Sequence, residues 1–186
     1  MQSSYFPMFV DISDKNIVVI GGGKIAARRV NTLLMFTQRL TIVSPFLCEE
    51  LQSVQGKIHW IPWEYTQDCL RGMDSVLAAT NQREINQQVA TDCRILEQKE
   101  QRRILVNIAD NKKLCDFYFP GVVQADEVTI GINSGGQNPR NVKKVRKKIQ
   151  EMLKDLDCWQ EYKKRVILCR DRIMDILQDK MNGENR

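Results

Sequence analysis

The chain has 186 residues, enough to bury one full core with a small extension. It is 42% hydrophobic and 27% charged, as soluble globular domains are, and no apolar run approaches the roughly 20 residues of a membrane helix. The net charge of +5 comes from the carboxy-terminal part, because residues 139–186 carry 14 Lys or Arg against 8 Asp or Glu. These numbers exclude a helical membrane protein, and the first residues do not show the pattern of a signal peptide.

The first predicted strand is Ile17–Ile20, a β-branched run of the kind found in strands covered on both faces. Three glycines, Gly21–Gly23, end it, and a helical pattern follows at once. Its apolar residues recur at helix spacing, at Ala26, Val30 and Leu33 or Leu34. The basic residues of this helix, which are Lys24, Arg28 and Arg29, can point to water.

The glycines form a possible dinucleotide-binding loop. Gly21, Gly23 and Ala26 occupy the three positions of G-x-G-x-x-G/A, which serve a tight turn, close approach of a pyrophosphate, and packing of the helix on the strand. The helix amino terminus offers free N–H groups to an anion. The alternative is a tight turn without a ligand, and the position of the loop in the first strand–helix unit favours the nucleotide.

The next elements alternate in type. Further strands are predicted at Leu40–Val43, Lys57–Trp60, Ser75–Ala79 and Ile104–Ile108, and helices at Cys48–Val54 and Glu84–Lys99, with a helix expected in every crossover. This alternation predicts an α/β fold, a Rossmann-like doubly wound parallel sheet that binds ligands at the carboxyl ends of its strands.

After the fifth predicted strand, the alternation of strands and helices ends. Two short extended segments, Val122–Gln124 and Val128–Ile132, suit a small antiparallel dimerisation segment, since such short strands are rarely stable alone. Between Pro139 and Met181 there is no proline or glycine, which predicts a helical region, bent or broken between Asp155 and Cys158. The predicted division is residues 1–113 for the nucleotide domain, 114–148 for the dimerisation segment and 149–186 for the helical carboxy-terminal region.

Polar residues follow the predicted strands at the edge where ligands bind. Asp110 ends the fifth strand and is a candidate proton acceptor, although a loop Asp that caps the next turn fits equally well. Thr80 and Asn81 follow the fourth strand, where they suit either the cofactor or the cap of the next helix. Ser44, a further candidate for cofactor binding, follows the second strand in place of the usual ribose-binding carboxylate. The residues therefore do not decide whether the cofactor is NAD or NADP.

A glycine pair and a basic run follow the short strands. Gly135 and Gly136 let backbone N–H groups converge, and Asn138 with Pro139 suits a helix start. The basic residues that follow, with no acid among them, are Arg140, Lys143, Lys144, Arg146, Lys147 and Lys148. They form a solvated face, a polycarboxylate site or a nucleic-acid site, and the absence of interleaved aromatics weighs against single-strand stacking. The six cysteines and the single histidine lack metal-ligand spacing, so no metal site and a reduced, cytoplasmic protein are predicted.

Four stretches together resemble one family. "YFPMFVDISDKNIVVIGGGKIAARRVNTLL", "AATNQREINQQVA", "VNIADNKKLCDFYFPGVV" and "INSGGQNPRNVKKVRKKI" resemble, in order and spacing, the precorrin-2 dehydrogenase and sirohydrochlorin ferrochelatase family, the amino-terminal part of siroheme synthases. The resemblance covers roughly Tyr5 to Leu153.

The resemblance implies an oxidoreductase, a homodimer that oxidises precorrin-2 to sirohydrochlorin with NAD in siroheme (porphyrin-type tetrapyrrole) biosynthesis. By position, Asp110 matches the catalytic aspartate and Ser134 the serine of the S-G-G loop, which continues in Gly135. The residues that match NAD contacts are Lys24, Ile25, Pro45 and Phe46. Arg140, Lys143 and Lys144 are candidates for the substrate's acetate and propionate groups.

Two questions stay open at this point. One is whether the protein also inserts a metal into sirohydrochlorin. The other is a rival interpretation, a non-catalytic NAD-sensing module whose basic helix binds DNA or a protein partner.

Overall fold

The computed structural model describes residues 6–125 and 128–154, which form two compact units. Of the described residues, the first unit contains those up to Pro120 together with Asn133–Gln137, and the second contains those of 121–132 and 138–154. The three-part division at residues 113 and 148 stays a prediction.

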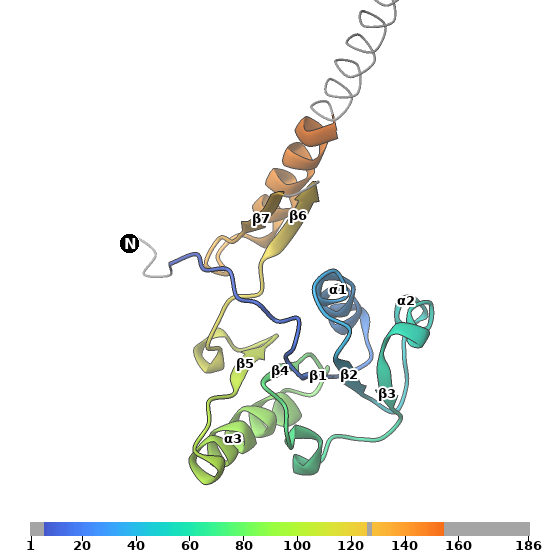
Figure 1. Cartoon of the computed structure of the whole chain (residues 1–186), viewed down its shortest axis with the longest axis vertical. Coiled ribbons are helices and arrows are strands. Elements are labelled where there is room, and N and C mark those ends of the chain that lie inside the picture. Colours follow the sequence, from blue (N-terminus) through green and yellow to red (C-terminus); the bar gives the residue numbers. More distant parts are fainter. Residues whose placement is uncertain (1–5, 126–127, 155–186) are drawn as a thin grey trace, which may run out of the picture. The chain divides into compact units, whose positions relative to one another are not determined.

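A five-stranded parallel sheet forms the centre of the first unit (Figure 1). Its strands are β1 (Ile17–Ile20), β2 (Leu40–Val43), β3 (His59–Ile61), β4 (Ser75–Ala78) and β5 (Leu105–Ile108). The order across the sheet is β3-β2-β1-β4-β5, so the winding reverses between β1 and β4. This confirms the Rossmann-like doubly wound fold, with its switch point at β1.

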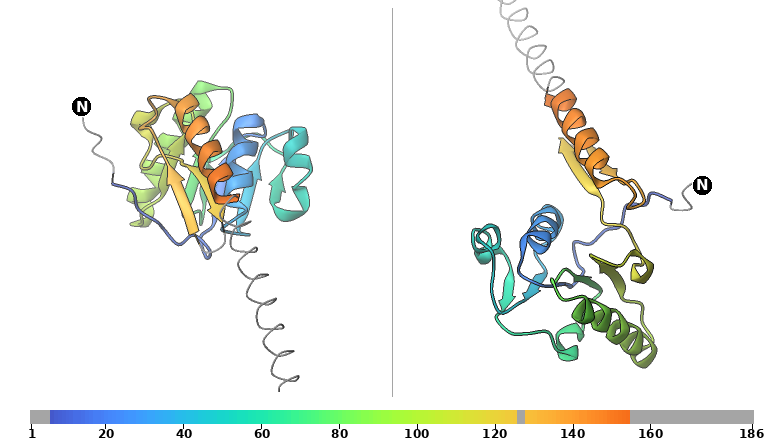
Figure 2. Two further views of the ribbon diagram at one scale, coloured as in Figure 1. Left: turned by 90° about the horizontal axis from the view of Figure 1, so that it is seen from above. Right: turned by 180° about the vertical axis from the view of Figure 1, so that it is seen from behind.

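Helices cover both faces of this sheet (Figure 2). α1 (Lys24–Leu33) and α2 (Glu49–Gln52) lie on one face, and α3 (Arg83–Glu100) lies on the other. Successive residues of β1 face opposite layers, since Val19 packs with α1 whereas Val18 and Ile20 pack with α3. The fully buried β-branched run therefore reflects a strand between two apolar layers.

Several predicted elements differ from the structure. The fourth strand ends at Ala78 and not Ala79, and the helix predicted at Cys48–Val54 spans Glu49–Gln52. The third strand begins at His59 and not at Lys57, because Gln55–Lys57 forms the 3₁₀ turn η1. The crossover from β3 to β4 contains the 3₁₀ turn η2 (Gln67–Leu70) and no α-helix. β5 begins one residue after Ile104, whose N–H donates to Glu97 Oε1 at 2.8 Å and not to a neighbouring strand.

The second unit contains an antiparallel pair, β6 (Gly121–Ala125) and β7 (Val128–Ile132), as predicted. Residues 139–154 are helical and pack on β6, where Val142 Cγ1 lies 3.1 Å from the position of a Cβ on Gly121. Asn138 Oδ1 accepts the N–H of Asn141 at 2.9 Å and so caps this helix. The predicted bend beyond Lys154 lies outside the described residues. None of the helices in the described part of the chain has the length and apolar composition of a membrane span.

Candidate functional site

The carboxyl ends of the parallel strands bring several predicted site residues to one edge of the sheet. Ile20, Ala78 and Ile108 are neighbours across β1, β4 and β5. The predicted residues that follow these three positions are Gly21–Gly23, Thr80–Asn81 and Asp110. Open α/β sheets bind ligands at this edge, beside the switch point, so the glycine loop and Asp110 occupy the expected position.

Gly21 and Gly22 form a turn with no room for side chains. Gly21 has a φ of +118°, and a Cβ there would lie 2.7 Å from the carbonyl oxygen of Ala79. A Cβ on Gly22 would overlap the carbonyl oxygen of Phe46. The turn role predicted for Gly21 agrees with this geometry, whereas the need for Gly22 was missed. An unbroken glycine triplet is the sequence signal for it, because a G-x-G motif alone leaves the middle position free.

Gly23 has free space where its neighbours have none. Apart from Gly23 and its chain neighbours, no described atom lies within 4 Å of the position that its Cβ would occupy, and its φ of −89° suits any residue. Gly23 is also the N-cap of α1, whose first turn holds no acidic residue and whose cap receives no side-chain hydrogen bond. The first N–H groups of α1 are therefore open to an anion, and the space beside Gly23 fits the pyrophosphate of a dinucleotide.

The residues after this loop and after β2 differ in exposure. Lys24, Ile25, Pro45 and Phe46 are all exposed, so their side chains are accessible to a cofactor. Ser44 is only 4% exposed, and its Oγ lies 2.6 Å from the position of a Cβ on Gly22. The Ser44 hydroxyl therefore packs against the glycine loop, and the role of Ser44 in cofactor binding stays a prediction.

Thr80 and the buried Asn86 fix the turn that follows β4. Thr80 Oγ1 accepts the N–H of Gln82 at 3.1 Å and lies 2.8 Å from Asn86 Oδ1. The Asn86 amide in turn donates to the carbonyl oxygen of Thr80 at 3.1 Å. The N-cap of α3 is Gln82 and not Thr80 or Asn81, and Asn81 is exposed at the ligand edge.

Asp110 is exposed after β5, and the S-G-G turn lies beside the segment that follows it. A Cβ on Gly136 would lie 3.8 Å from Tyr118 Cε1 and 3.9 Å from Lys112 Cδ. The structure thus brings the turn that contains Ser134 and Gly135 next to Lys112, two residues after Asp110. The sequence analysis did not connect Lys112 with this turn, and its nearness in sequence to Asp110 was the available signal.

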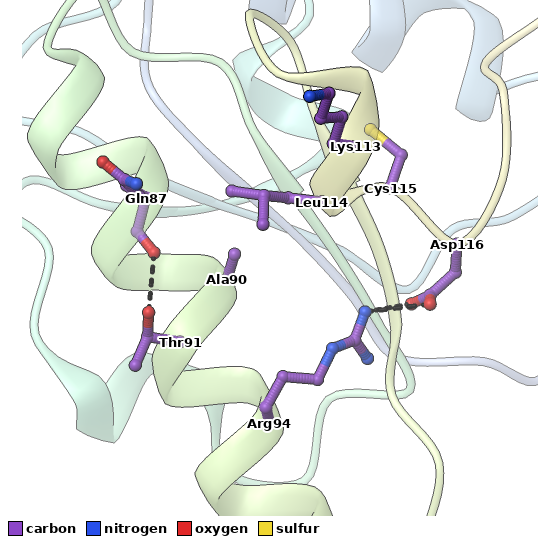
Figure 3. A pocket seen from close by; sticks show the side chains of 8 residues that line it. All are labelled: Gln87, Ala90, Thr91, Arg94, Lys113, Leu114, Cys115 and Asp116. Atoms are coloured by element: carbon purple, nitrogen blue, oxygen red, sulfur yellow. Dashed lines mark hydrogen bonds and ion pairs between the residues drawn. The ribbon is translucent and has the colours of Figure 1, made fainter.

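An ion-pair network holds the other end of this segment (Figure 3). Arg94 Nη2 on α3 donates to both carboxylate oxygens of Asp116, at 2.8 and 2.9 Å. The backbone N–H of Val106 in β5 donates to Asp116 Oδ2 at 2.8 Å. The segment that carries Asp110 is therefore fastened to both α3 and β5.

A pocket of about 270 Å³ lies between α3 and the same segment (Figure 3). Its lining residues are Gln87, Ala90, Thr91, Arg94, Lys113, Leu114, Cys115 and Asp116. None of the predicted site residues is among them, and two of its three charged side chains, Arg94 and Asp116, pair with each other. Burial raises the pKa of the Cys115 thiol, which keeps it protonated. The pocket is therefore separate from the cofactor edge. Within residues 6–125 and 128–154, no three His, Cys, Asp or Glu side chains are grouped to hold a metal ion.

Glu97 is the second carboxylate of the network, since its Oε2 pairs with Arg94 Nη1 at 2.8 Å, and its replacement tests the network's contribution. Burial opposes its charge, but the N–H of Ile104 and the guanidinium of Arg94 hold the pKa of Glu97 below its ordinary value. A carboxylate with a depressed pKa stabilises the fold above its unfolded pKa, and this stabilisation is lost as the pH falls through the folded pKa. We expect Glu97→Gln to lower the free energy of unfolding at neutral pH by about 1–3 kcal/mol. Urea unfolding should show this difference shrinking below roughly pH 4, and a constant difference would contradict the role of the charge.

Arg29 is buried, and the prediction that it points to water is wrong. Arg29 is only 6% exposed, because it lies one helical turn from Ala26 and from Leu33, on the face of α1 that packs on the sheet. Arg29 Cζ lies 5.6 Å from the centroid of the Phe119 ring. Burial lowers the pKa of Arg29 to about 10, which leaves the guanidinium charged at neutral pH. The helical spacing from Ala26 was the signal that could have revealed this.

Arg140, Lys143 and Lys144 belong to the second unit, where all three are exposed on the helix that Asn138 caps. Their contact with a substrate stays a prediction.

Known proteins resemble this chain in sequence and in fold. The siroheme synthase of Photorhabdus laumondii is 34% identical over 151 residues, which are 80% of this chain and 31% of that protein. The siroheme synthase of Nitrosospira multiformis is 36% identical over 156 residues, 81% of this chain and 32% of that protein. The chain thus spans less than a third of the length of these relatives.

A solved structure named "SirC, precorrin-2 dehydrogenase" matches with a TM-score of 0.62 at 20% identity, over 79% of this chain and 70% of that one. An identity this low shows a shared fold. A family model described as "Putative NAD(P)-binding" matches residues 8–121, which contain the glycine loop and Asp110. Since this match covers more than half of the residues, the chain belongs to the NAD(P)-binding family that the model describes.

Proposed function

We propose that this protein oxidises precorrin-2 to sirohydrochlorin with NAD as the hydride acceptor, on the route to siroheme. The sequence relatives are named siroheme synthases, and the structure with the same fold is named precorrin-2 dehydrogenase. The observation that carries the proposal is the position of Asp110 on the same sheet edge as the open Gly23 and the uncapped start of α1.

The reaction removes a hydride and a proton from the reduced tetrapyrrole. Bound NAD supplies the hydride acceptor. Gly23 and the first N–H groups of α1 bind its pyrophosphate, and the exposed carboxylate of Asp110 takes the proton from the substrate. The ion pairs of Asp116 hold the segment after Asp110 in place during this step.

The basic run of the second unit is proposed to attract the polycarboxylate substrate. We expect replacement of Lys143, Lys144 and Lys147 by glutamine to raise KM for precorrin-2 and flatten its dependence on salt, because surface charges are screened by ions. Steady-state kinetics at two ionic strengths measures both effects. Loss of DNA retention with unchanged KM would instead favour the NAD-sensing interpretation.

We also propose a cytoplasmic homodimer that binds neither nucleic acid nor membrane. The two-stranded pair β6–β7 is short, and Val128 is 54% exposed on it, so a partner surface would stabilise it. Light scattering at micromolar concentration should give the mass of a dimer, and a monomer would contradict the assembly.

Incubation of the purified protein with precorrin-2 and NAD tests the function directly. Sirohydrochlorin and NADH should appear in equal amounts, and NADP should support the reaction less well. Subsequent addition of ferrous or cobaltous ion to the same mixture shows whether metal insertion follows. Absence of NADH formation with authentic precorrin-2 would overturn the proposal.

A further inference from the structure

Arg29 holds buried hydrogen-bond donors that nothing in the described chain satisfies. Its Nε and Nη1 atoms are fully buried and have no hydrogen-bond partner among the described residues. A buried donor without an acceptor costs stability, and the cost is larger for a charged group. An apolar side chain at this position would avoid that cost, so the packing of α1 does not explain why a guanidinium is present there.

The surroundings of Arg29 place it at the proposed active site. Ala109 and Phe119 pack against the same apolar cluster as Ala26 of α1. Asp110 follows Ala109, and its carboxylate attracts the charge of Arg29. The guanidinium therefore lies over the ring of Phe119, which packs against the same apolar cluster as Ala109, the residue before Asp110.

Asp110 does not itself supply the missing acceptor. No hydrogen bond or salt bridge joins the two side chains in the part of the chain that the structure describes. Asp110 remains exposed, whereas Arg29 remains buried with its Nε and Nη1 donors unsatisfied among the described residues.

We propose that Arg29 is a binding residue for a carboxylate group of the tetrapyrrole, beside the proton-accepting Asp110. The inference rests on the proposed function and adds a residue that orients the substrate. A guanidinium presents N–H donors in a rigid plane that suits a carboxylate, and shielding from water strengthens such a bond. The half-buried ring of Phe119 lies against the guanidinium, so binding of the substrate carboxylate requires this ring to move.

The test compares Arg29→Met with Arg28→Met in the full chain. Both remove one positive charge from α1, but Arg28 is exposed. Binding of sirohydrochlorin to each protein is measured without NAD by the change in its absorbance, and its fully esterified form is measured in parallel. NAD binding and thermal unfolding of the free proteins are measured separately. Arg29→Met should bind sirohydrochlorin about ten- to a hundredfold more weakly than wild type, the scale of one charge-assisted hydrogen-bonding group. Arg28→Met should bind it as wild type does, and the ester should not distinguish the three proteins.

Unfolding of the free protein distinguishes this role from a structural one. Arg29→Met should melt at the same temperature as wild type or higher, because it removes an unpaired buried charge. A lower melting temperature with unchanged sirohydrochlorin binding would overturn the inference and make Arg29 a packing residue. A loss of NAD affinity in place of sirohydrochlorin affinity would overturn it too. If the wild-type protein neither bound sirohydrochlorin nor oxidised precorrin-2, both the proposed function and the inference would be wrong. If wild type and Arg29→Met bound sirohydrochlorin equally well, only the inference would be wrong.

Discussion

Replacement of Asp110 by asparagine is expected to lower turnover of precorrin-2 by about a hundredfold or more, the usual scale for a lost acid–base group. The asparagine keeps the size of the side chain and removes its basicity. Asp110 is exposed at the end of β5, outside the Arg94–Asp116 network, so folding and NAD binding should be unchanged. Single-turnover formation of NADH, with circular dichroism and NAD titration alongside, measures these three properties.

Asp68→Asn is a matched control for this variant. Asp68 is also an exposed aspartate, in η2, and pairs with the exposed Arg71. It should retain wild-type turnover. Near wild-type turnover in Asp110→Asn would remove Asp110 from the dehydrogenation, and a defect confined to metal insertion would assign it to that step.

Replacement of Gly23 by valine is expected to weaken NAD binding by roughly ten- to a hundredfold while leaving the fold intact. The space beside Gly23 is free of protein atoms, so the added side chain meets the pyrophosphate and not the chain. Its backbone conformation is one that valine adopts without strain. Calorimetric titration with NAD, compared with thermal unfolding of the free variant, separates cofactor affinity from stability.

Gly56→Val offers the same change at another unobstructed glycine. A Cβ on Gly56 also has no atom within 4 Å, and Gly56 lies in η1, before β3. NAD affinity should be unchanged in this variant. If Gly23→Val and Gly56→Val bound NAD equally well, the pyrophosphate would lie elsewhere than beside Gly23.

Local patterns in the sequence determined most of the fold and the cofactor edge. The β-branched run of β1, the glycine triplet and the spacing of α3 are readable because period, turn and cap signals act between near neighbours in the chain. The alternation of strands and helices then places Gly21–Gly23 and Asp110 on one edge, since the carboxyl ends of parallel strands meet there. Site residues such as Pro45 and Ser134 came from resemblance to a family.

Tertiary structure decided the features that depend on distant residues, although the glycine triplet and the spacing of Arg29 from Ala26 were weak local signals for two of them. Gly22 is essential because it approaches Phe46, and the S-G-G turn reaches Lys112 across more than twenty residues. The β3–β4 crossover contains a 3₁₀ turn, which the alternation of strands and helices did not predict. Arg29 is buried because α1 packs on the sheet on the side where Phe119 lies, and charge alone suggests the opposite. Burial and pairing of polar groups arise from long-range packing, which short sequence patterns do not encode.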